Sequence, residues 1–153
     1  MGGISACRAT VQGFARILAL FALLLVAASC GGGSSAPSGT PVAPANGALT
    51  VRASEWGFEP PNIILQPGQQ VRLTFANDGA ILHDLKIDAL DATGVTSQSA
   101  GGPSGDQGEL FVAANPGKTG TLVFTPSESG TFDFYCTIPQ HRQLGMEGTM
   151  IVE

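Results

Sequence analysis

The sequence predicts an all-β domain, a Greek-key β-sandwich of about eight strands, and two observations support this. Short apolar runs are separated by turn-forming residues at a spacing of roughly 8–12 residues, which is typical of sandwiches and barrels. Beyond the first 29 residues, no stretch keeps for long the 3.6-residue apolar period that an amphipathic helix needs. The predicted elements are therefore short strands joined by turns.

Turn chemistry bounds each predicted strand. We expect strands at Ala48–Ala53, Asn62–Leu65, Gln70–Ala76, Leu82–Asp88, Glu109–Ala113, Thr119–Thr125, Thr131–Thr137 and Gly148–Val152. Glycine accepts a positive φ, proline fixes φ, and Asn and Asp side chains bond to their own backbone. Residues of these types lie between the strands, at Pro60-Pro61, Pro67-Gly68, Asn77-Asp78-Gly79, Asn115-Pro116-Gly117 and 126–130. The Gly- and Ser-rich stretch 88–108 is expected to form a flap whose role the sequence does not indicate.

Two strands carry candidate metal ligands. Side chains alternate between the faces of a sheet, so Cys136 shares the inward face of Phe134, and His83 shares the inward face of Leu85. Asp84 then points to the opposite face. Cys136 and His83 each extend an apolar row at one end of a strand. If both strand ends lie at the same pole of the sandwich, the two side chains meet there.

A short C-terminal loop completes the ligand set. Cys136, His141 and Met146 follow one another at five-residue intervals, and His83 supplies a second imidazole from upstream. A thiolate, two imidazoles and a weak thioether form the ligand set of a blue-copper site. Thiolate and thioether suit Cu(I), and imidazole suits both oxidation states of copper. The spacing therefore predicts one copper ion.

Two blocks of sequence resemble the cupredoxin family over nearly the whole predicted domain. One runs from Glu55-Trp56-Gly57-Phe58-Glu59-Pro60 to His83-Asp84, and the other contains Gly130–Cys136 and Gly145–Met150. The ligand-loop spacing is similar to that of auracyanins, sulfocyanins and rusticyanin, whereas plastocyanin has a shorter Cys-to-His gap. Many relatives place Asn, not Asp84, after the first histidine, to bridge the two ligand loops. An ionised carboxylate accepts hydrogen bonds and donates none, so that bridge is not predicted here.

The resemblance implies a one-electron carrier that is a monomer and shuttles electrons between redox proteins of a respiratory or photosynthetic chain. Cys136, His83 and His141 would hold the copper in a trigonal plane, with Met146 as the weak axial ligand. The family's C-terminal histidine reaches the surface through an apolar patch where a partner docks. Candidates for that patch, which simple loop packing would equally explain, are Ile81, Ile138, Pro139 and Leu144.

The numbers of histidine and methionine residues bear on the alternative functions, which are a copper enzyme, a copper carrier, a metal-free lipoprotein and a zinc protein. The chain has two histidines, both used by the predicted site, so none is left for the further copper centre of an oxidase or nitrite reductase. A periplasmic copper carrier or chaperone would share the ligands. Beyond the signal the only methionines are Met146 and Met150, so the methionine-rich surface expected for copper loading is missing. A metal-free adhesion or interaction lipoprotein would explain the anchor and the sandwich, but it would not explain the spacing of the Cys, His and Met residues. Zinc is disfavoured because a thioether is a poor ligand for it.

The N-terminus predicts export and anchoring. Arg8 and Arg16 precede an apolar run that is too short to span a bilayer, which is typical of a signal peptide over residues 1–29. The end of this run resembles a bacterial lipobox, so we expect lipidation at Cys30; the alternative is a soluble secreted protein cut near Ser29. Residues 30–47 are Gly-, Ser- and Pro-rich and predict a flexible tether to the domain 48–153. The expected location is extracytoplasmic, in the periplasm or on the cell surface, anchored to a membrane.

Cysteine use and charge agree with this assignment. Of three cysteines, Cys7 belongs to the signal and Cys30 to the anchor, so Cys136 has no disulfide partner and is better explained as a ligand. Beyond residue 29, five basic residues against twelve acidic ones give a net charge of −7. This charge disfavours nucleic acid as a partner. It would either steer a basic redox partner or serve solubility alone.

Overall fold

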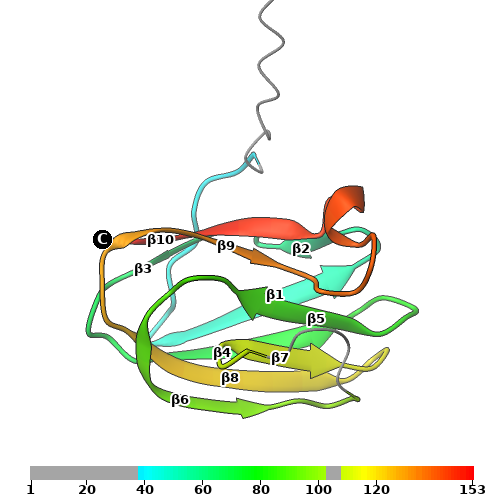
Figure 1. Ribbon diagram of the computed structural model, residues 1–153, viewed down its shortest axis with the longest axis horizontal. Helices are drawn as coiled ribbons and strands as arrows, with labels where there is room; N and C mark the ends of the chain where they lie inside the picture. Colours follow the sequence, from blue (N-terminus) through cyan, green and yellow to red (C-terminus); the bar gives the residue numbers. More distant parts are fainter. Residues whose placement is uncertain (1–37, 103–107) are drawn as a thin grey trace, which may run out of the picture. The chain divides into compact units, whose positions relative to one another are not determined.

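The computed structural model describes residues 38–102 and 108–153 (Figure 1). The predicted signal peptide, Cys30 and the first part of the tether lie outside the described residues. The described part contains ten strands and one 3-10 turn, η1 (Arg142–Leu144). The strands are β1 (Ala48–Ser54), β2 (Gly57–Glu59), β3 (Asn62–Leu65), β4 (Val71–Asn77), β5 (His83–Ile87), β6 (Ala92–Gln98), β7 (Phe111–Ala114), β8 (Thr119–Pro126), β9 (Gly130–Tyr135) and β10 (Glu147–Val152).

The strands form two five-stranded sheets that pack face to face (Figure 1). One sheet has the order β2-β1-β4-β8-β6, and the other has the order β3-β10-β9-β5-β7. The pairs β1–β4 and β3–β10 are parallel, and the remaining neighbours are antiparallel. Most neighbours are not consecutive in the chain, as a Greek-key connection requires. The predicted all-β Greek-key sandwich is confirmed.

The sequence analysis predicted about eight strands and missed two. One is β2, which pairs with the end of β1, and the other is β6, which lies within the segment 88–108 that was predicted to be a flap. β6 is an edge strand beside β8, and all seven of its side chains are exposed or half-buried. Only Ala92 and Val95 pack partly against the core, so β6 needs little apolar alternation and the sequence carries a weak signal for it.

Alternating burial along the inner strands forms one core between the sheets. In β1 the pattern is strict, with Leu49, Val51 and Ala53 buried between exposed neighbours. The aromatic rings of Phe75, Phe124 and Phe134 are among the largest fully buried side chains. Burying a side chain of this size contributes about 1.5–3 kcal/mol. The core therefore gives the ligand-bearing strands a rigid base.

Part of the predicted tether is paired with the domain. Val42 forms an isolated parallel bridge to Ile63 of β3, and Ala45 forms an isolated antiparallel bridge to Ala48 at the start of β1. Ordered backbone contacts therefore begin before residue 48. Over residues 38–102 and 108–153, no helix has the length and apolar character to cross a membrane.

Three connections gather at one end of the sandwich, at the right of Figure 1. They are the turn between β1 and β2, the loop between β4 and β5, and the loop that follows β9. His83 begins β5, and Cys136 comes directly after β9. The fold therefore brings both predicted ligands to the same pole.

Candidate metal centre

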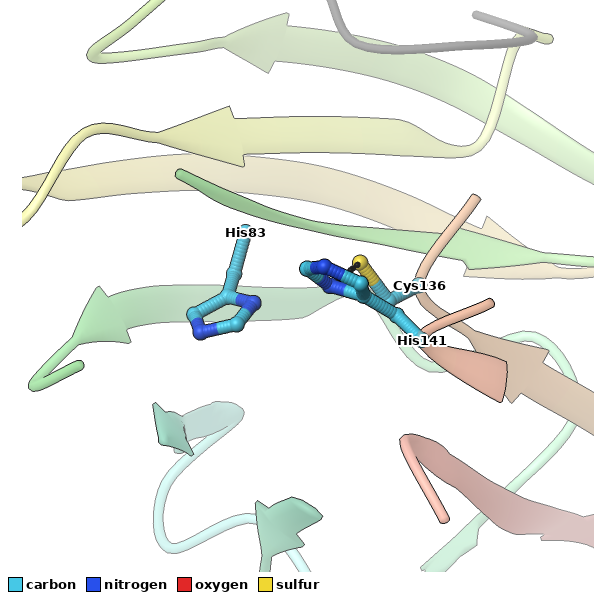
Figure 2. A group of neighbouring side chains, drawn as sticks. All are labelled: His83, Cys136 and His141. Carbon is cyan, nitrogen blue, oxygen red and sulfur yellow. Dashed lines mark hydrogen bonds between the residues drawn. The ribbon is translucent and has the colours of Figure 1, made fainter. Parts of the chain in front are cut away.

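His83, Cys136 and His141 converge at this pole (Figure 2). One donor atom from each side chain lies within 4.8 Å of the other two. The exposed fractions are 0% for His83, 1% for Cys136 and 6% for His141. Three soft or borderline donors at this spacing, shielded from water, form a site that a transition metal fits.

The two histidines present the same ring nitrogen to this space. His141 Nδ1 lies 3.4 Å from Cys136 Sγ. His83 Nε2 lies 3.2 Å from Glu55 Oε1, and His83 Nδ1 is buried with no hydrogen-bond partner among the described residues. A buried ring nitrogen left without a partner is costly, because it has lost its hydration. A metal ion would bind it, so the donor set fits the predicted ion.

The ligand loop is fixed by its own backbone. Cys136 N donates to Met146 O at 3.1 Å, and Met146 N donates to His141 O at 3.1 Å. Gly145 closes the turn η1 with φ 115°, in the region that glycine adopts without strain. These bonds tie three of the four predicted ligands to one another. The Met146 side chain is fully buried, and its axial role stays a prediction.

Arg142 holds the same loop through side-chain hydrogen bonds. Its Nε donates to Glu147 Oε2 and its Nη2 donates to Asp133 Oδ2, each at 2.8 Å. The guanidinium carbon also lies 4.2 Å from the centre of the Tyr135 ring. Because β9 and β10 carry these partners, the turn beside His141 is held against the hairpin that bears Cys136.

Asp84 is a buried charged residue on the ligand strand β5. The alternation puts it on the face of β5 opposite His83, and the structure buries it completely. Its carboxylate accepts hydrogen bonds from Thr137 N at 2.6 Å and from Thr137 Oγ1 at 2.9 Å. The connection between the β5 ligand strand and the C-terminal ligand loop is therefore present, with Asp84 as acceptor. It needs no donor on residue 84, and Thr137 covers that face of β5.

Burial sets the protonation of the donors. It raises the pKa of the Cys136 thiol to about 11, and the nearby charge of Asp84 acts in the same direction. Burial also lowers the pKa of His141, and the neighbouring His83 adds to this effect. Backbone N–H groups, first that of Glu55 itself and then that of Ala80, lower the pKa of the Glu55 carboxyl. At neutral pH the metal-free site thus holds a protonated thiol and a neutral His141.

Sequence reasoning missed three residues that shape the site. Glu55 contacts His83, as described above. Asn77, 1% exposed, ties the β4–β5 loop to β7 by donating to Ile81 O at 2.7 Å and to Ala114 O at 2.8 Å. Trp56 lies over both histidines, with its ring centre 4.8 Å from that of His141 and 6.4 Å from that of His83. Glu55 and Trp56 lie in the β1–β2 turn and Asn77 is the last residue of β4, where a sequence has no periodicity to reveal a contact.

The predicted docking residues occupy different environments. Ile81 and Leu144 are exposed, Pro139 is exposed at the start of the turn, and Ile138 is half-buried against the core. His141, expected to reach the surface, is buried, and the exposed ring above it is Trp56. Three exposed apolar side chains lie near the ligands: Trp56 packs on both histidines, Leu144 N donates to His141 O, and Ile81 is two residues before His83.

Comparisons with known proteins agree with this geometry. Residues 45–153 match the family model described as copper binding proteins of the plastocyanin/azurin family. The chain is 31% identical over 123 residues to the copper-resistant cuproprotein CopI of Rubrivivax gelatinosus, covering 76% of this chain and 73% of that protein. It is 26% identical over 150 residues to auracyanin-A of Chloroflexus aurantiacus, covering 87% of this chain and 92% of that protein.

A solved structure shows the same fold. Reduced auracyanin from Roseiflexus castenholzii superposes with a TM-score of 0.54 at 23% identity, over 70% of this chain and 97% of the other. The family match and the cluster of His83, Cys136 and His141 together identify the cofactor as one copper ion. On this evidence the chain belongs to the plastocyanin/azurin family of copper-binding proteins, as a cupredoxin that resembles the auracyanins.

Proposed function

We propose that this protein is a one-electron carrier with a single blue-copper site. The observation that carries the proposal is the buried cluster of three donor atoms within 4.8 Å of one another. Copper, when bound, supplies a one-electron couple between Cu(I) and Cu(II). The chain's own contribution is a donor set that suits both states, held by backbone bonds that need not change between them. A site of this kind exchanges electrons with little rearrangement.

The same residues argue against catalysis at the metal. The chain has two histidines, and the site uses both, so no imidazole remains for a second copper centre. Met146 is buried beside the cluster, and we propose that its thioether fills the fourth position. With that position filled, a substrate has no ligand site to occupy.

Copper handling is a second candidate function. The relative with 31% identity is named a copper-resistant cuproprotein, and a protein that carries copper would share the same ligands. A carrier must release its ion to an acceptor, whereas a shuttle retains it through many redox cycles. Retention of copper is therefore the property that separates the two proposals.

The deciding experiment loads the protein with one equivalent of Cu(II) and follows its absorption and EPR spectra. An electron carrier should show an intense thiolate-to-copper charge-transfer band with narrow hyperfine splitting. The band should bleach with ascorbate and return with oxidant over repeated cycles, with no copper lost to a competing chelator. A weak tetragonal signal, or copper that leaves on reduction, would reject the electron-carrier proposal and favour copper handling.

We propose that the carrier is exported and anchored through Cys30, and that it exchanges electrons with redox proteins of a respiratory or photosynthetic chain. The proposed docking surface consists of Trp56, Ile81 and Leu144, and the proposed occupant is the apolar face of such a redox protein. In the described part of the chain, four large apolar side chains are exposed, and three of them make up this surface. The fourth, Val42, pairs with β3 instead.

Polar substitution on this surface should slow electron transfer to the partner. We expect Leu144→Ser and Ile81→Ser each to lower the second-order rate with isolated respiratory or photosynthetic membranes about fivefold, since a docking residue contributes about 1 kcal/mol or more. The rate with a small inorganic oxidant should not change. Val42→Ser is the matched control, with the same exposed fraction, 42%, as Ile81. Equal second-order rates for all three variants would show that the partner does not dock on Ile81 and Leu144.

Copper affinity should rise with pH. In the metal-free protein the pKa of the Cys136 thiol is about 11, so binding between pH 6 and 8 must expel the thiol proton. Each pH unit then raises the apparent affinity about tenfold, and acid weakens binding because protons compete with the metal. Competition titrations with a Cu(I) chelator at pH 6, 7 and 8 measure this slope. A flat profile would show that the thiol is already ionised without metal.

A further inference from the structure

We propose that Glu55 is a positioning residue for the copper site, which holds His83 in its metal-binding tautomer and favours the oxidised state of the copper. It deepens the proposed function, on which it rests for the occupancy of the site by copper. Glu55 follows β1 directly, and none of the predicted ligands lies near it in the sequence.

A single oxygen atom of Glu55 joins three groups. Glu55 Oε1 accepts hydrogen bonds from Ala80 N at 2.9 Å and Ile81 N at 3.3 Å, and it lies 3.2 Å from His83 Nε2. The two backbone donors hold the carboxylate in place. Because the carboxylate also contacts His83 Nε2, it limits the orientation of the imidazole ring. Glu55 therefore connects the β1–β2 turn to the first ligand of β5.

The loop before β5 approaches this contact closely at Gly79. A Cβ at Gly79 would lie 2.6 Å from Glu55 Oε1 and 2.9 Å from His83 Nε2, closer than real Cβ contacts come. The loop before β5 thus passes directly over the carboxylate and the ring. Asn77 holds that loop by accepting from Gly79 N at 2.9 Å and donating to Ile81 O. The Glu55–His83 pair is built into the packing of the pole.

The contact determines which nitrogen of His83 carries the proton. An ionised carboxylate only accepts, so Nε2 must be the donor, and Nδ1 is left with a free lone pair. Nδ1 is the buried nitrogen without a partner among the described residues, on the side of the metal cluster. A carboxylate behind a ligating histidine is a common way to fix its tautomer and orientation.

The negative charge of Glu55 also favours the oxidised state of the copper site. A negative group next to a ligand stabilises the oxidised site more than the reduced one, because the oxidised site carries one more positive charge. The Glu55 side chain is 31% exposed, so water screens part of this effect. Glu55 should therefore tighten Cu(II) binding more than Cu(I) binding.

Two substitutions separate these roles. In Glu55→Gln the side-chain carbonyl still accepts from His83, so nitrogen-15 NMR of the metal-free protein should show the same single tautomer. The ratio of Cu(I) to Cu(II) affinity should rise above that of the wild-type protein, because the substitution removes the negative charge that favours the oxidised site. In Glu55→Ala the NMR spectrum should show both tautomers. Asp78→Asn is the control, since Asp78 pairs with Arg52 and its loss removes the same charge.

A merely structural role gives a different result. If Glu55 only held the loop, Glu55→Ala would weaken Cu(I) and Cu(II) binding equally and leave the His83 tautomer unchanged, which would overturn the proposal. An affinity ratio in Glu55→Gln equal to that of Asp78→Asn would overturn it as well. The NMR comparison needs no copper, so failure of the electron-carrier function in the wild-type protein remains distinguishable from failure of this inference.

Discussion

Replacing Cys136 by serine is expected to abolish the charge-transfer band and to lower Cu(I) affinity more than 100-fold. A serine hydroxyl is a hard donor that stays protonated at neutral pH, so the site loses the soft thiolate that suits Cu(I). The loss of an outer partner already costs about 10–100-fold in metal affinity, and loss of a ligand itself should exceed that. His83 and His141 remain and should hold Cu(II) weakly, in a tetragonal geometry.

Absorption, EPR and chelator competition on the same preparation measure this result. Cys30→Ser is the matched control, because it makes the same change at a cysteine that is not a predicted ligand and should keep the band intact. Cys136 is buried, so a serine there leaves a hydroxyl in an apolar site at a cost of about 1–3 kcal/mol. Thermal unfolding of the metal-free variant checks that the fold survives. A charge-transfer band that persists in Cys136→Ser would remove Cys136 from the ligand set.

The ligands could be predicted because most of the site is local in sequence. Cys136, His141 and Met146 lie on one loop, and their spacing is set by that loop's own backbone bonds. His83 was found from a second regularity, the alternation that places it in line with the buried Leu85. Where a site is built from a short loop and a strand end, residue order carries most of the geometry.

The surroundings of the ligands depend on contacts that no sequence period records. Glu55 reaches His83 across 28 residues, from the β1–β2 turn to the start of β5. Alternation assigns Asp84 to a face of β5 but does not tell what covers that face, where Thr137 donates to its carboxylate. β6 was missed because this edge strand buries none of its residues fully. These features appear only when loops and edges are placed in space.

The second large effect is expected in the core beneath the site, at Phe134. Phe134 lies on β9 two residues before Cys136 and is completely buried. Its ring centre lies 5.4 Å from that of Phe58, and its partner across the strands is Gly148 of β10. A Cβ at Gly148 would come within 2.2 Å of the Phe134 ring and 2.5 Å of the Pro61 carbonyl, so the ring fills the space above that glycine.

Phe134→Ala should lower the free energy of unfolding by about 3–5 kcal/mol, because it removes buried apolar surface and leaves a cavity. A domain of this size has about 5–15 kcal/mol in total, so the metal-free variant should lose a large part of its stability. Denaturant titration of the metal-free protein measures the change, and Phe134→Leu, which keeps most of the volume, should lose less. We expect copper to bind the folded state more tightly than the unfolded chain, so saturating copper should restore part of the lost stability in both variants. A loss below about 1 kcal/mol in Phe134→Ala would mean that the strand carrying Cys136 does not depend on this ring. The contrary outcome is that copper restores no stability while the charge-transfer band persists. The unfolded chain would then bind copper as tightly as the folded protein does, and the preformed site would not be the cause of the band.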